Sequence, residues 1–433
     1  MNEQLTATKQ LGDLALLSAG STQWRADAAA AFATSGVPTL RDEAWKFTNL
    51  RMLDKVLFTT PTSDDAPALE ADRLPRFLPE AARLVFVNGR FDADASTLPE
   101  LPEGATLLPL AEAIAADNPV VTEHLGAIFA RDDEARAFAH LNSAMVQDGL
   151  VLHVPRGKEI TQPIELLFLS DVSDEALTIT PRLLVVMEQA SRATLIEHHA
   201  VLGKAEANHM INVAAEIHVA RDAHLSHFRL QNAHPAAFHF TNQTAEVDTG
   251  AHYDTFTLTT GAGLSRNDIR VKFVGDHAEA SLNGLYLIRG NQHCDTSSRI
   301  THAEESCASR QTYKGVIADK AHGVFQGKIE VTRKAQKTDG YQLNRALLLS
   351  PTAEINAKPE LEIFADDVIC SHGCTAGQLD ETGLFYIMSR GIPEKEARKL
   401  LIHAYMGEAI ELIEHEGLRE AAIAHAGRWM DGL

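Results

Sequence analysis

The sequence is poor in basic residues, cysteine and aromatic side chains, and each shortage argues against a class of function. Acidic residues outnumber lysine and arginine 59 to 39, and the formal charge of -20 argues against a nucleic acid or an anionic membrane as partner. No run approaches the roughly 18 apolar residues of a membrane helix, and the start of the chain lacks the pattern of a secretory signal. We therefore expect a cytoplasmic protein whose partners are proteins or cations.

Only four cysteines are present, all between Cys294 and Cys374, so a disulfide framework is not expected. The chain also has no glycine-rich phosphate loop and no G-x-S-x-G elbow. These absences argue against a nucleotide hydrolase and against a serine hydrolase of that type.

The first 145 residues have a mixed pattern that predicts an N-terminal helical domain with a linker. Helical spacing marks the first 55 residues, where Asp42 is placed to cap a helix start. Residues 59–75 mix Pro, Thr, Ser and Asp without periodicity, which is typical of a surface linker. Asn88-Gly89 between alternating apolar residues predicts a hairpin, and helical stretches follow near residues 109–145.

From about residue 150 to 369 the sequence is dominated by short alternating runs that predict strands. A polar corner followed by alanine recurs roughly every 30 residues, and this period favours a solenoid whose coils stack strand on strand. A β-sandwich with chance recurrence of Ala and Asp at its turns is the alternative. The match at Ala321 falls on a different corner of the same coil as Ala308. The alanines are Ala193, Ala223, Ala251, Ala278, Ala308, Ala321 and Ala353.

After the strands the pattern returns to helix, beginning at Pro393 and with a break at Gly417. The sequence thus predicts three parts, which are an N-terminal domain (1–145), a parallel β-helix core (146–374) and a C-terminal helical domain (375–433). The apolar stripe of the last part includes Ala397, Leu400, Leu401 and Ala404.

The segment "CSHGC" places Cys370, His372 and Cys374 at alternate positions. Two thiolates and an imidazole are ligands that zinc, iron or copper(I) accept. A closed structural zinc site needs a fourth ligand, which the neighbouring sequence lacks. From the residues alone, a tight turn with incidentally buried thiols is therefore the favoured interpretation, because free cysteine commonly packs as a small hydrophobe.

Histidines and carboxylates elsewhere offer two further hypotheses. The histidines concentrate in residues 197–240, so a metal-storing homodimer is conceivable, although alternation in strands favours packed or solvated side chains. Glu360, Glu362, Asp366 and Asp367 provide carboxylates for acid and base chemistry on a polysaccharide. With 6% aromatic residues the chain has few side chains to line a sugar cleft, so a solvated charged edge is the simpler interpretation.

Six segments spread over nearly the whole chain carry a further signal. They are "RDEAWKFTNL" (41–50), "VFVNGRF" (85–91), "LNSAMVQDGLVLHVPRG" (141–157), "SLNGLYL" (281–287), "NAKPELEIFADDVICSHGCTAGQLD" (356–380) and "YIMSRGIPEKEARKLLIHAYM" (386–406). Together these segments resemble the SufB/SufD family of iron-sulfur cluster assembly proteins, and within it the SufD branch. The "CSHG" pattern and "DEAWKFT" favour the SufD branch, since SufB has acidic residues around the corresponding histidine.

The resemblance implies a right-handed parallel β-helix with helical domains at both ends. It also implies a non-enzymatic scaffold in a cytoplasmic complex with SufB and the ATPase SufC. SufB would pair through the β-helix cores, and SufC would dock on the C-terminal helices. Sulfur would arrive indirectly from a cysteine desulfurase through SufE. The isolated chain is a possible homodimer.

The resemblance also implies roles for individual residues. His372 matches the family histidine that binds iron or the nascent cluster at the SufB interface, and Cys370 matches its neighbouring cysteine. Cys374 stands where many relatives have alanine, so no role is carried over to it. We expect no tightly bound cofactor in the isolated chain, only iron or a transient cluster at the shared interface. For SufC docking we expect contacts from Pro393, Ala397, Leu400, Leu401, Ala404 and Tyr405.

Overall fold

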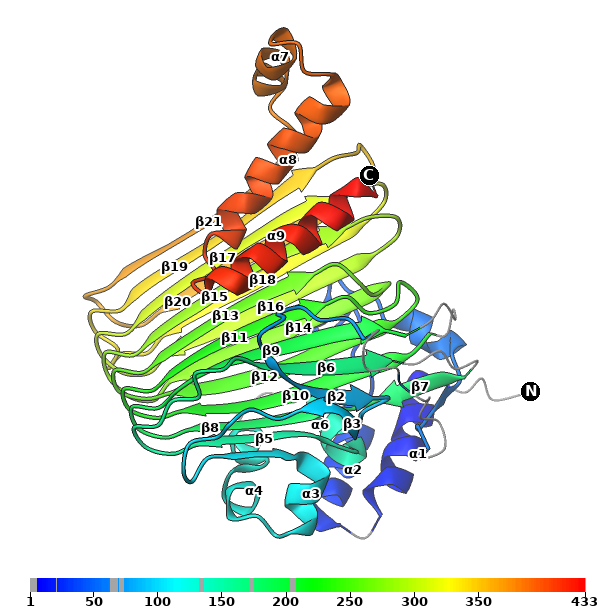
Figure 1. Ribbon diagram of the computed structural model, residues 1–433, viewed down its shortest axis with the longest axis vertical. Helices are drawn as coiled ribbons and strands as arrows, with labels where there is room; N and C mark the ends of the chain where they lie inside the picture. Colours follow the sequence, from blue (N-terminus) through cyan, green and yellow to red (C-terminus); the bar gives the residue numbers. More distant parts are fainter. Residues whose placement is uncertain are drawn as a thin grey trace.

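The chain forms a β-solenoid with helices at both ends, which confirms the predicted fold class (Figure 1). The computed structural model describes residues 6–20, 22–62, 69, 74–131, 136–170, 175–202 and 208–432. Successive strands of the coils alternate between two sheets, and each strand pairs in parallel with the equivalent strand of the next coil. Because every coil adds one strand to each sheet, side chains at equivalent positions stack into ladders along the solenoid.

The two sheets differ in what covers their outer faces. The 11-stranded sheet consists of β1 (Phe58–Thr59), β4 (Thr106–Pro109), β5 (Gly149–Val154), β7 (Ala176–Ile179), β8 (Arg182–Met187), β10 (Met210–Val219), β12 (Phe238–Val247), β14 (Leu264–Phe273), β16 (His293–His302), β18 (His322–Val331) and β20 (Glu354–Ile363). The 10-stranded sheet consists of β2 (Ala82–Val87), β3 (Arg90–Thr97), β6 (Ile164–Ser170), β9 (Arg192–Val201), β11 (His224–Gln231), β13 (His252–Thr259), β15 (Glu279–Ile288), β17 (Ala308–Ile317), β19 (Asp339–Leu348) and β21 (Ile369–Gly377). Helices of the N-terminal part lie on the first sheet, and helices of the C-terminal part lie on the second.

Each corner that leads into the 10-stranded sheet combines a left-handed residue with a small buried one. Asp222 has φ 57° and precedes the fully buried Ala223, and the same pair of conformations recurs at later corners. The strand register shows that Ser191 and Cys307, and not Ala193 and Ala308, are equivalent to Ala223. At those two coils the predicted repeat is therefore wrong by one or two residues.

The predicted change of corner at Ala321 is confirmed. This buried residue precedes β18, which belongs to the 11-stranded sheet, and Ala353 precedes β20 in the same way. Small side chains at these corners let neighbouring coils approach closely. They therefore recur at the corners that lead into either sheet.

The solenoid interior is mainly apolar, but one layer is ionic. Glu197 and Arg229 are both buried and form an ion pair of 2.6 Å inside the coil. His227 also contacts the Glu197 carboxylate at 2.7 Å, and Arg229 donates to Gln243 at 2.5 Å. Burial alone would raise the pKa of Glu197, but Arg229 and the hydrogen bonds from the histidines hold it well below its usual range. This layer gives the interior a fixed arrangement of charges.

The N-terminal helices cover the outer face of the 11-stranded sheet. Their apolar side chains pack on β10, β12 and β14, and Phe138 stacks on Phe240 with ring centroids 4.0 Å apart. The helices are α1 (Ala7–Ala19), α2 (Gln23–Ser35), η1 (Glu43–Trp45), η2 (Arg51–Lys55), α3 (Leu110–Ala115), α4 (Pro119–His124), α5 (Ala127–Ala130) and α6 (Ala137–Met145).

The segment 41–50 crosses from these helices to the middle of the solenoid. The centre of the Trp45 ring lies 4.0 Å from the guanidinium carbon of Arg266, and the Thr48 hydroxyl donates to the buried Asp295 carboxylate at 2.5 Å. Asp42 precedes only the 3-10 turn η1, and its carboxylate accepts from the Thr39 backbone and not from the following turn. The predicted capping of a following helix by Asp42 is thus wrong, because this segment is fixed by contacts with the sheet.

Two further predicted features of the N-terminal part are a hairpin and a linker. The hairpin at Asn88-Gly89 is confirmed, since β2 and β3 pair antiparallel and both turn residues have positive φ. Most of the predicted linker at 59–75 lies outside the described residues. Among the residues described, no helix is both long and apolar enough to cross a membrane.

The C-terminal helices are α7 (Glu381–Ser389), α8 (Glu394–Ile410) and α9 (Glu416–Asp431). Part of α8 and all of α9 cover the outer face of the 10-stranded sheet, where Met406 and Trp429 join a cluster with Phe228, Phe256 and Leu285. By contrast, α7 stands away from the sheets beyond the last coil (Figure 1). The domain limits at residues 145 and 374 stay a prediction.

Candidate functional site

The "CSHGC" segment lies on β21, the last strand of the 10-stranded sheet. On one side β21 pairs with β19, so that Cys370, His372 and Cys374 lie beside Gly340, Gln342 and Asn344, respectively. No described strand pairs with its other side. The segment is therefore the end of the solenoid and not a turn, which removes one of the two interpretations of the sequence.

Alternation along the strand places the two cysteines and the histidine on the same face of β21. Cys370 packs against the cluster of Ile329 and Val331, and Cys374 packs against another interior cluster, so this face is directed into the coil. Both cysteines are half-buried, whereas His372 is exposed. The imidazole is thus the most accessible ligand of the three.

Burial affects the chemistry of the two thiols. Desolvation raises the pKa of Cys370 and of Cys374 above the ordinary value of a thiol. Both are therefore protonated at neutral pH, and a metal that binds either sulfur has to displace its proton. Cys294 and Cys307 lie deeper in the solenoid, where burial raises their pKa values to about 12 and about 11. Neither of these cysteines lies at the open end.

A polar layer lies directly under His372. Gln342 is fully buried, yet neither its amide nitrogen nor its amide oxygen has a hydrogen-bond partner among the described residues, and the amide nitrogen of Asn344 has none there either. The Gln342 side chain fills the space beside Gly327, where a Cβ would lie 1.5 Å from its nitrogen. Buried amides without partners are uncommon, and these two lie in the coil next to the open end.

The three side chains of β21 do not form a metal site by themselves. Among the residues described, the only group of three ligand atoms that converge is His224, Asp254 and Glu414, on another part of the molecule. A metal at the last coil would therefore take one or two ligands from this chain and the others from elsewhere. The interpretation as part of a shared site stays a prediction.

The last coil also exposes backbone and apolar side chains. β20 and β21 each end their sheet, and edge strands present free N–H and C=O groups that another chain can pair with. Phe364 and Ile369, which lie in and beside this coil, have exposures of 57% and 74%. An exposed edge with apolar residues is typical of a protein interaction surface.

The carboxylates of the polysaccharide hypothesis lie beside lysines. Glu362 pairs with Lys328 at 2.9 Å, and Glu360 pairs with Lys358 at 3.0 Å. Lys358 also contacts Glu43 of the N-terminal part at 2.6 Å. These contacts are sufficiently explained as surface ion pairs, so they give no support to an acid and base pair formed by Glu360 and Glu362.

Several histidines of residues 197–240 are buried in the solenoid. His199, His227 and His239 are at most 2% exposed, and desolvation lowers the pKa of each. His198 contacts the buried Glu165 at 2.7 Å. These side chains belong to the interior, and a store of exchangeable metal needs accessible ones.

The predicted docking residues divide into two groups. Leu400 is 51% exposed, and Pro393 and Ala404 are exposed as well. Ala397 is fully buried and Leu401 half-buried. Tyr405, the sixth residue of the set, is half-buried beside the solenoid, where Lys314 lies 4.2 Å from its ring. A partner on this helix can therefore meet the first group directly, while the buried residue fixes the helix.

A second apolar surface was not predicted from the sequence. Phe385, Tyr386 and Met388 on α7 have exposures of 74%, 59% and 40%. They belong to the helix that stands away from the solenoid (Figure 1), so the solenoid does not cover them. The sequence signal that could have indicated this surface is the group of three apolar residues close together before Gly391-Ile392-Pro393.

Comparison with known protein families gives two matches that together span most of the chain. The model described as "SUF system FeS cluster assembly, SufBD core domain" matches residues 168–405. The model described as "SufBD protein N-terminal region" matches residues 16–166. The first match contains the solenoid from β6 onward together with the "CSHGC" segment and α7.

Individual relatives show the same likeness. An iron-sulfur cluster assembly SufBD family protein of Synechocystis sp. PCC 6803 is 33% identical over 385 residues, covering 87% of this chain and 84% of the relative. The iron-sulfur cluster assembly protein SufD of Escherichia coli K12 is 31% identical over 400 residues, covering 92% and 90%. SufD of Bacillus subtilis 168 is 25% identical over 288 residues, covering 66% and 64%.

Proposed function

The chain belongs to the SufBD family of iron-sulfur cluster assembly proteins and is SufD-like, and from this premise we propose that it is a non-catalytic scaffold subunit. In the proposal it pairs with SufB through its last coil and binds the ATPase SufC through residues 375–433. His372 binds iron or the nascent cluster at the SufB interface. The chain itself has no phosphate-binding loop, which fits an ATPase that is a separate subunit.

The observation that carries the proposal is the open last coil. It combines two unpaired strand edges with an exposed imidazole above the unpartnered amide of Gln342. A second protein that adds strands to β20 and β21 would satisfy the edges, cover Ile369 and bring its own ligands toward His372. The open edges and the exposed Ile369 are less favourable in an isolated chain than in a complex that covers them.

The ligand set suits a cargo that has to leave. A neutral imidazole binds ferrous iron, and a site with few ligands from each subunit releases its metal more readily than a closed one. Cys370 is a possible second ligand once its proton is displaced, because its sulfur lies on the same face as the imidazole. Cys374 packs against the interior cluster around Tyr286, so we assign it no ligand role.

The first experiment tests the role of His372 in the co-purified complex with SufB and SufC. Iron content and cluster yield are measured for His372→Ala, with His277→Ala at an exposed corner as the matched control. We expect both quantities to fall only in the first variant. An intact His372→Ala complex with unchanged iron and cluster would remove this residue from the mechanism.

The second experiment tests pairing through the edge of β21. Ile369 donates its backbone N–H to Thr338 on the side of β19. Residues an odd number of positions further along β21, such as Ala376, therefore direct their N–H groups to the open edge. Ala376→Pro should therefore leave the β19 ladder intact but block pairing with another chain. Loss of SufB from a pull-down of the folded variant is expected, and full retention would place the interface elsewhere.

The third experiment tests the C-terminal surface. Removing α8 and α9 would uncover the apolar sheet face, so point variants are preferable to truncation. Phe385→Ala and Leu400→Ala should weaken SufC binding, whereas Ile423→Ala, on the exposed side of α9, should not. Equal retention of SufC by all three variants would exclude this surface.

A further inference from the structure

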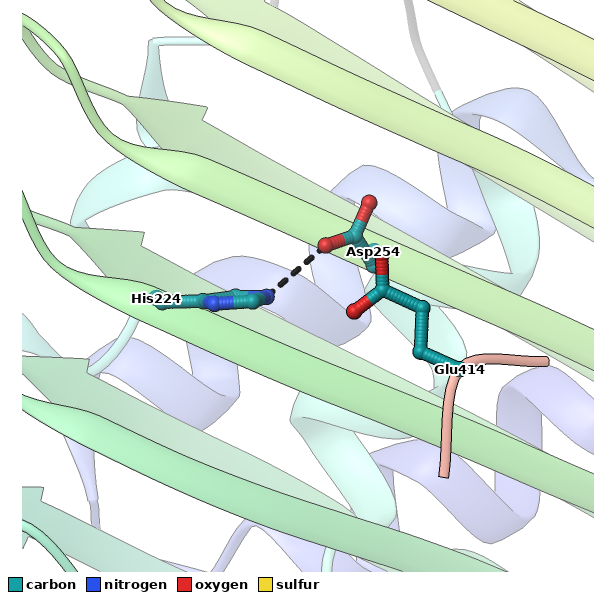
Figure 2. A group of neighbouring side chains, drawn as sticks. All are labelled: His224, Asp254 and Glu414. Carbon is teal, nitrogen blue, oxygen red and sulfur yellow. Dashed lines mark hydrogen bonds and ion pairs between the residues drawn. The ribbon is translucent and has the colours of Figure 1, made fainter. Parts of the chain in front are cut away.

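Three side chains from separate parts of the chain converge on the outer face of the 10-stranded sheet. His224 lies on β11, Asp254 on β13, and Glu414 in the turn between α8 and α9 (Figure 2). The Nε2 atom of His224 lies 2.8 Å from Oδ2 of Asp254, and one ligand atom of each residue lies within 4.8 Å of the other two. The group is remote from the last coil and is independent of the proposed function.

Among the residues that the structure describes, no lysine or arginine forms an ion pair with the carboxylate of Asp254 or Glu414. Glu414 makes no side-chain hydrogen bond or ion pair with any described residue, and Asp254 has only His224 as an ion-pair partner. Even so, the turn directs the carboxylate of Glu414 toward that of Asp254 (Figure 2). Two carboxylates held this close repel each other unless a cation lies between them.

We propose that His224, Asp254 and Glu414 bind a divalent first-row transition metal that fastens the α8–α9 turn to the solenoid. One imidazole nitrogen and two carboxylate oxygens suit zinc, manganese, iron(II) or cobalt(II), and three protein ligands leave a position for water. Ligand atoms around a tetrahedral metal lie about 3.3 Å apart, so the present spacing needs only small side-chain movements.

Arg192 fixes the tautomer of His224 in the metal-free site. Its guanidinium nitrogen lies 3.3 Å from Nδ1 of His224. Since a guanidinium can only donate, the neutral ring carries its proton on Nε2 and donates it to Asp254. Metal binding at Nε2 moves this proton to Nδ1, and the exposed Arg192 side chain then turns into solvent. Arg192 therefore competes with the metal.

This competition gives variants with opposite effects. Glu414→Gln removes a ligand at an exposed position without disturbing the sheet, and we expect at least about a tenfold loss of affinity. Arg192→Gln removes the competing cation and provides an acceptor for Nδ1–H, so its dissociation constant should be lower than that of the wild type. Glu411→Gln, on the same exposed segment, is the matched control and should bind like the wild type.

The experiment titrates the full metal-free chain with cobalt(II) and records visible absorption and heat. Thiolate-to-cobalt charge-transfer bands report binding at cysteines, so a site made of nitrogen and oxygen is recognised by their absence. The proposal predicts that thiolate-free cobalt binding is weaker than in the wild type by at least about tenfold in both Glu414→Gln and His224→Ala. Cobalt should also slow amide exchange in residues 411–418 of the wild type.

Two results would overturn the proposal. One is a thiolate-free cobalt isotherm in Glu414→Gln that matches the wild type, which would mean that the three residues form only an ion pair that depends on protonation. The other is weaker cobalt binding by Arg192→Gln than by the wild type, which would contradict the assigned tautomer. Because Glu414→Gln changes an exposed residue outside the sheet, misfolding should not confuse the first result.

Discussion

Replacing Arg229 by methionine should destabilise the solenoid by about 3–5 kcal/mol, because it leaves a buried carboxylate without its cation. The guanidinium donates to Glu197 at 2.6 Å, to Gln243 at 2.5 Å and to Asn267 at 3.0 Å. Methionine has a similar length and fills much of the same space, so cavity formation contributes little. The loss arises from three acceptors that remain buried.

The matched control is Arg310→Met. Arg310 also lies on a strand of the 10-stranded sheet and pairs with an acid of the next coil, Asp339, at 2.5 Å. Its side chain is 47% exposed, however, whereas that of Arg229 is 2% exposed. An exposed pair contributes about 0–1 kcal/mol, so the two substitutions should differ severalfold.

Chemical denaturation of the full chain, followed by circular dichroism, measures both variants. The double variant Arg229→Met, Glu197→Gln should recover part of the loss, because it removes the buried charge as well as its partner. A loss in Arg229→Met no larger than that in Arg310→Met would refute the reasoning. It would mean that the interior relaxes or admits water around Glu197.

Three further outcomes follow from single positions. Gly149→Ala should prevent the first coil from closing, because its Cβ would lie 1.8 Å from a backbone oxygen of the adjacent strand, whereas Gly12→Ala, with no atom within 4 Å, should be tolerated in the same denaturation assay. Burial lowers the pKa of His302 to about 4, so its contribution is complete above the unfolded value of about 6.5 and is lost as the pH falls toward 4. His302→Gln should therefore reduce the slope of stability against pH by about 1.4 kcal/mol per unit in that window, and an unchanged slope would contradict this. Thr48→Val removes the hydroxyl that donates to Asp295 and should cost about 1–3 kcal/mol, with faster proteolysis of the 41–50 segment as the readout.

The regular part of the fold was predictable because its signals are local. A two-residue period predicts strands, and Asn88-Gly89 predicts a tight turn, since both depend on a few neighbouring residues. The corners were predicted less well, as the positions of Ala193 and Ala308 show. Cys307 is the small buried residue at its corner, where other coils have alanine. A pattern that looks for alanine therefore selected Ala308, one residue too late, and only the strand register corrects it.

The ionic interior was not predictable from alternation. Glu197 lies on β9 and Arg229 on β11. In a strand of alternating polar and apolar residues, a charged residue normally indicates the outer face. Their placement inside depends on Gln243 and Asn267, which lie on strands of the opposite sheet. A sequence pattern that considers one strand at a time cannot show such a network.

The candidate sites show the same limit at a larger scale. Cys370, His372 and Cys374 are close in sequence, so their spacing alone was enough to predict a shared chemistry for them. His224, Asp254 and Glu414 are far apart along the chain and meet only because neighbouring coils stack and the α8–α9 turn lies on the sheet. Sequence spacing therefore identified the segment at the open end and missed the group on the sheet face.

The open end also connects stability with assembly. In a solenoid each coil is stabilised by its two neighbours, and the coil of β20 and β21 has a neighbour on one side only. Cys370 and Cys374 are only half-buried and His372 is exposed, because no described coil covers this one. A partner that binds there would stabilise the coil by the free energy of binding, because the bound state requires its strands to be formed. Binding of the partner would also bring the remaining ligands to His372, so His372 would be a competent ligand mainly within the complex.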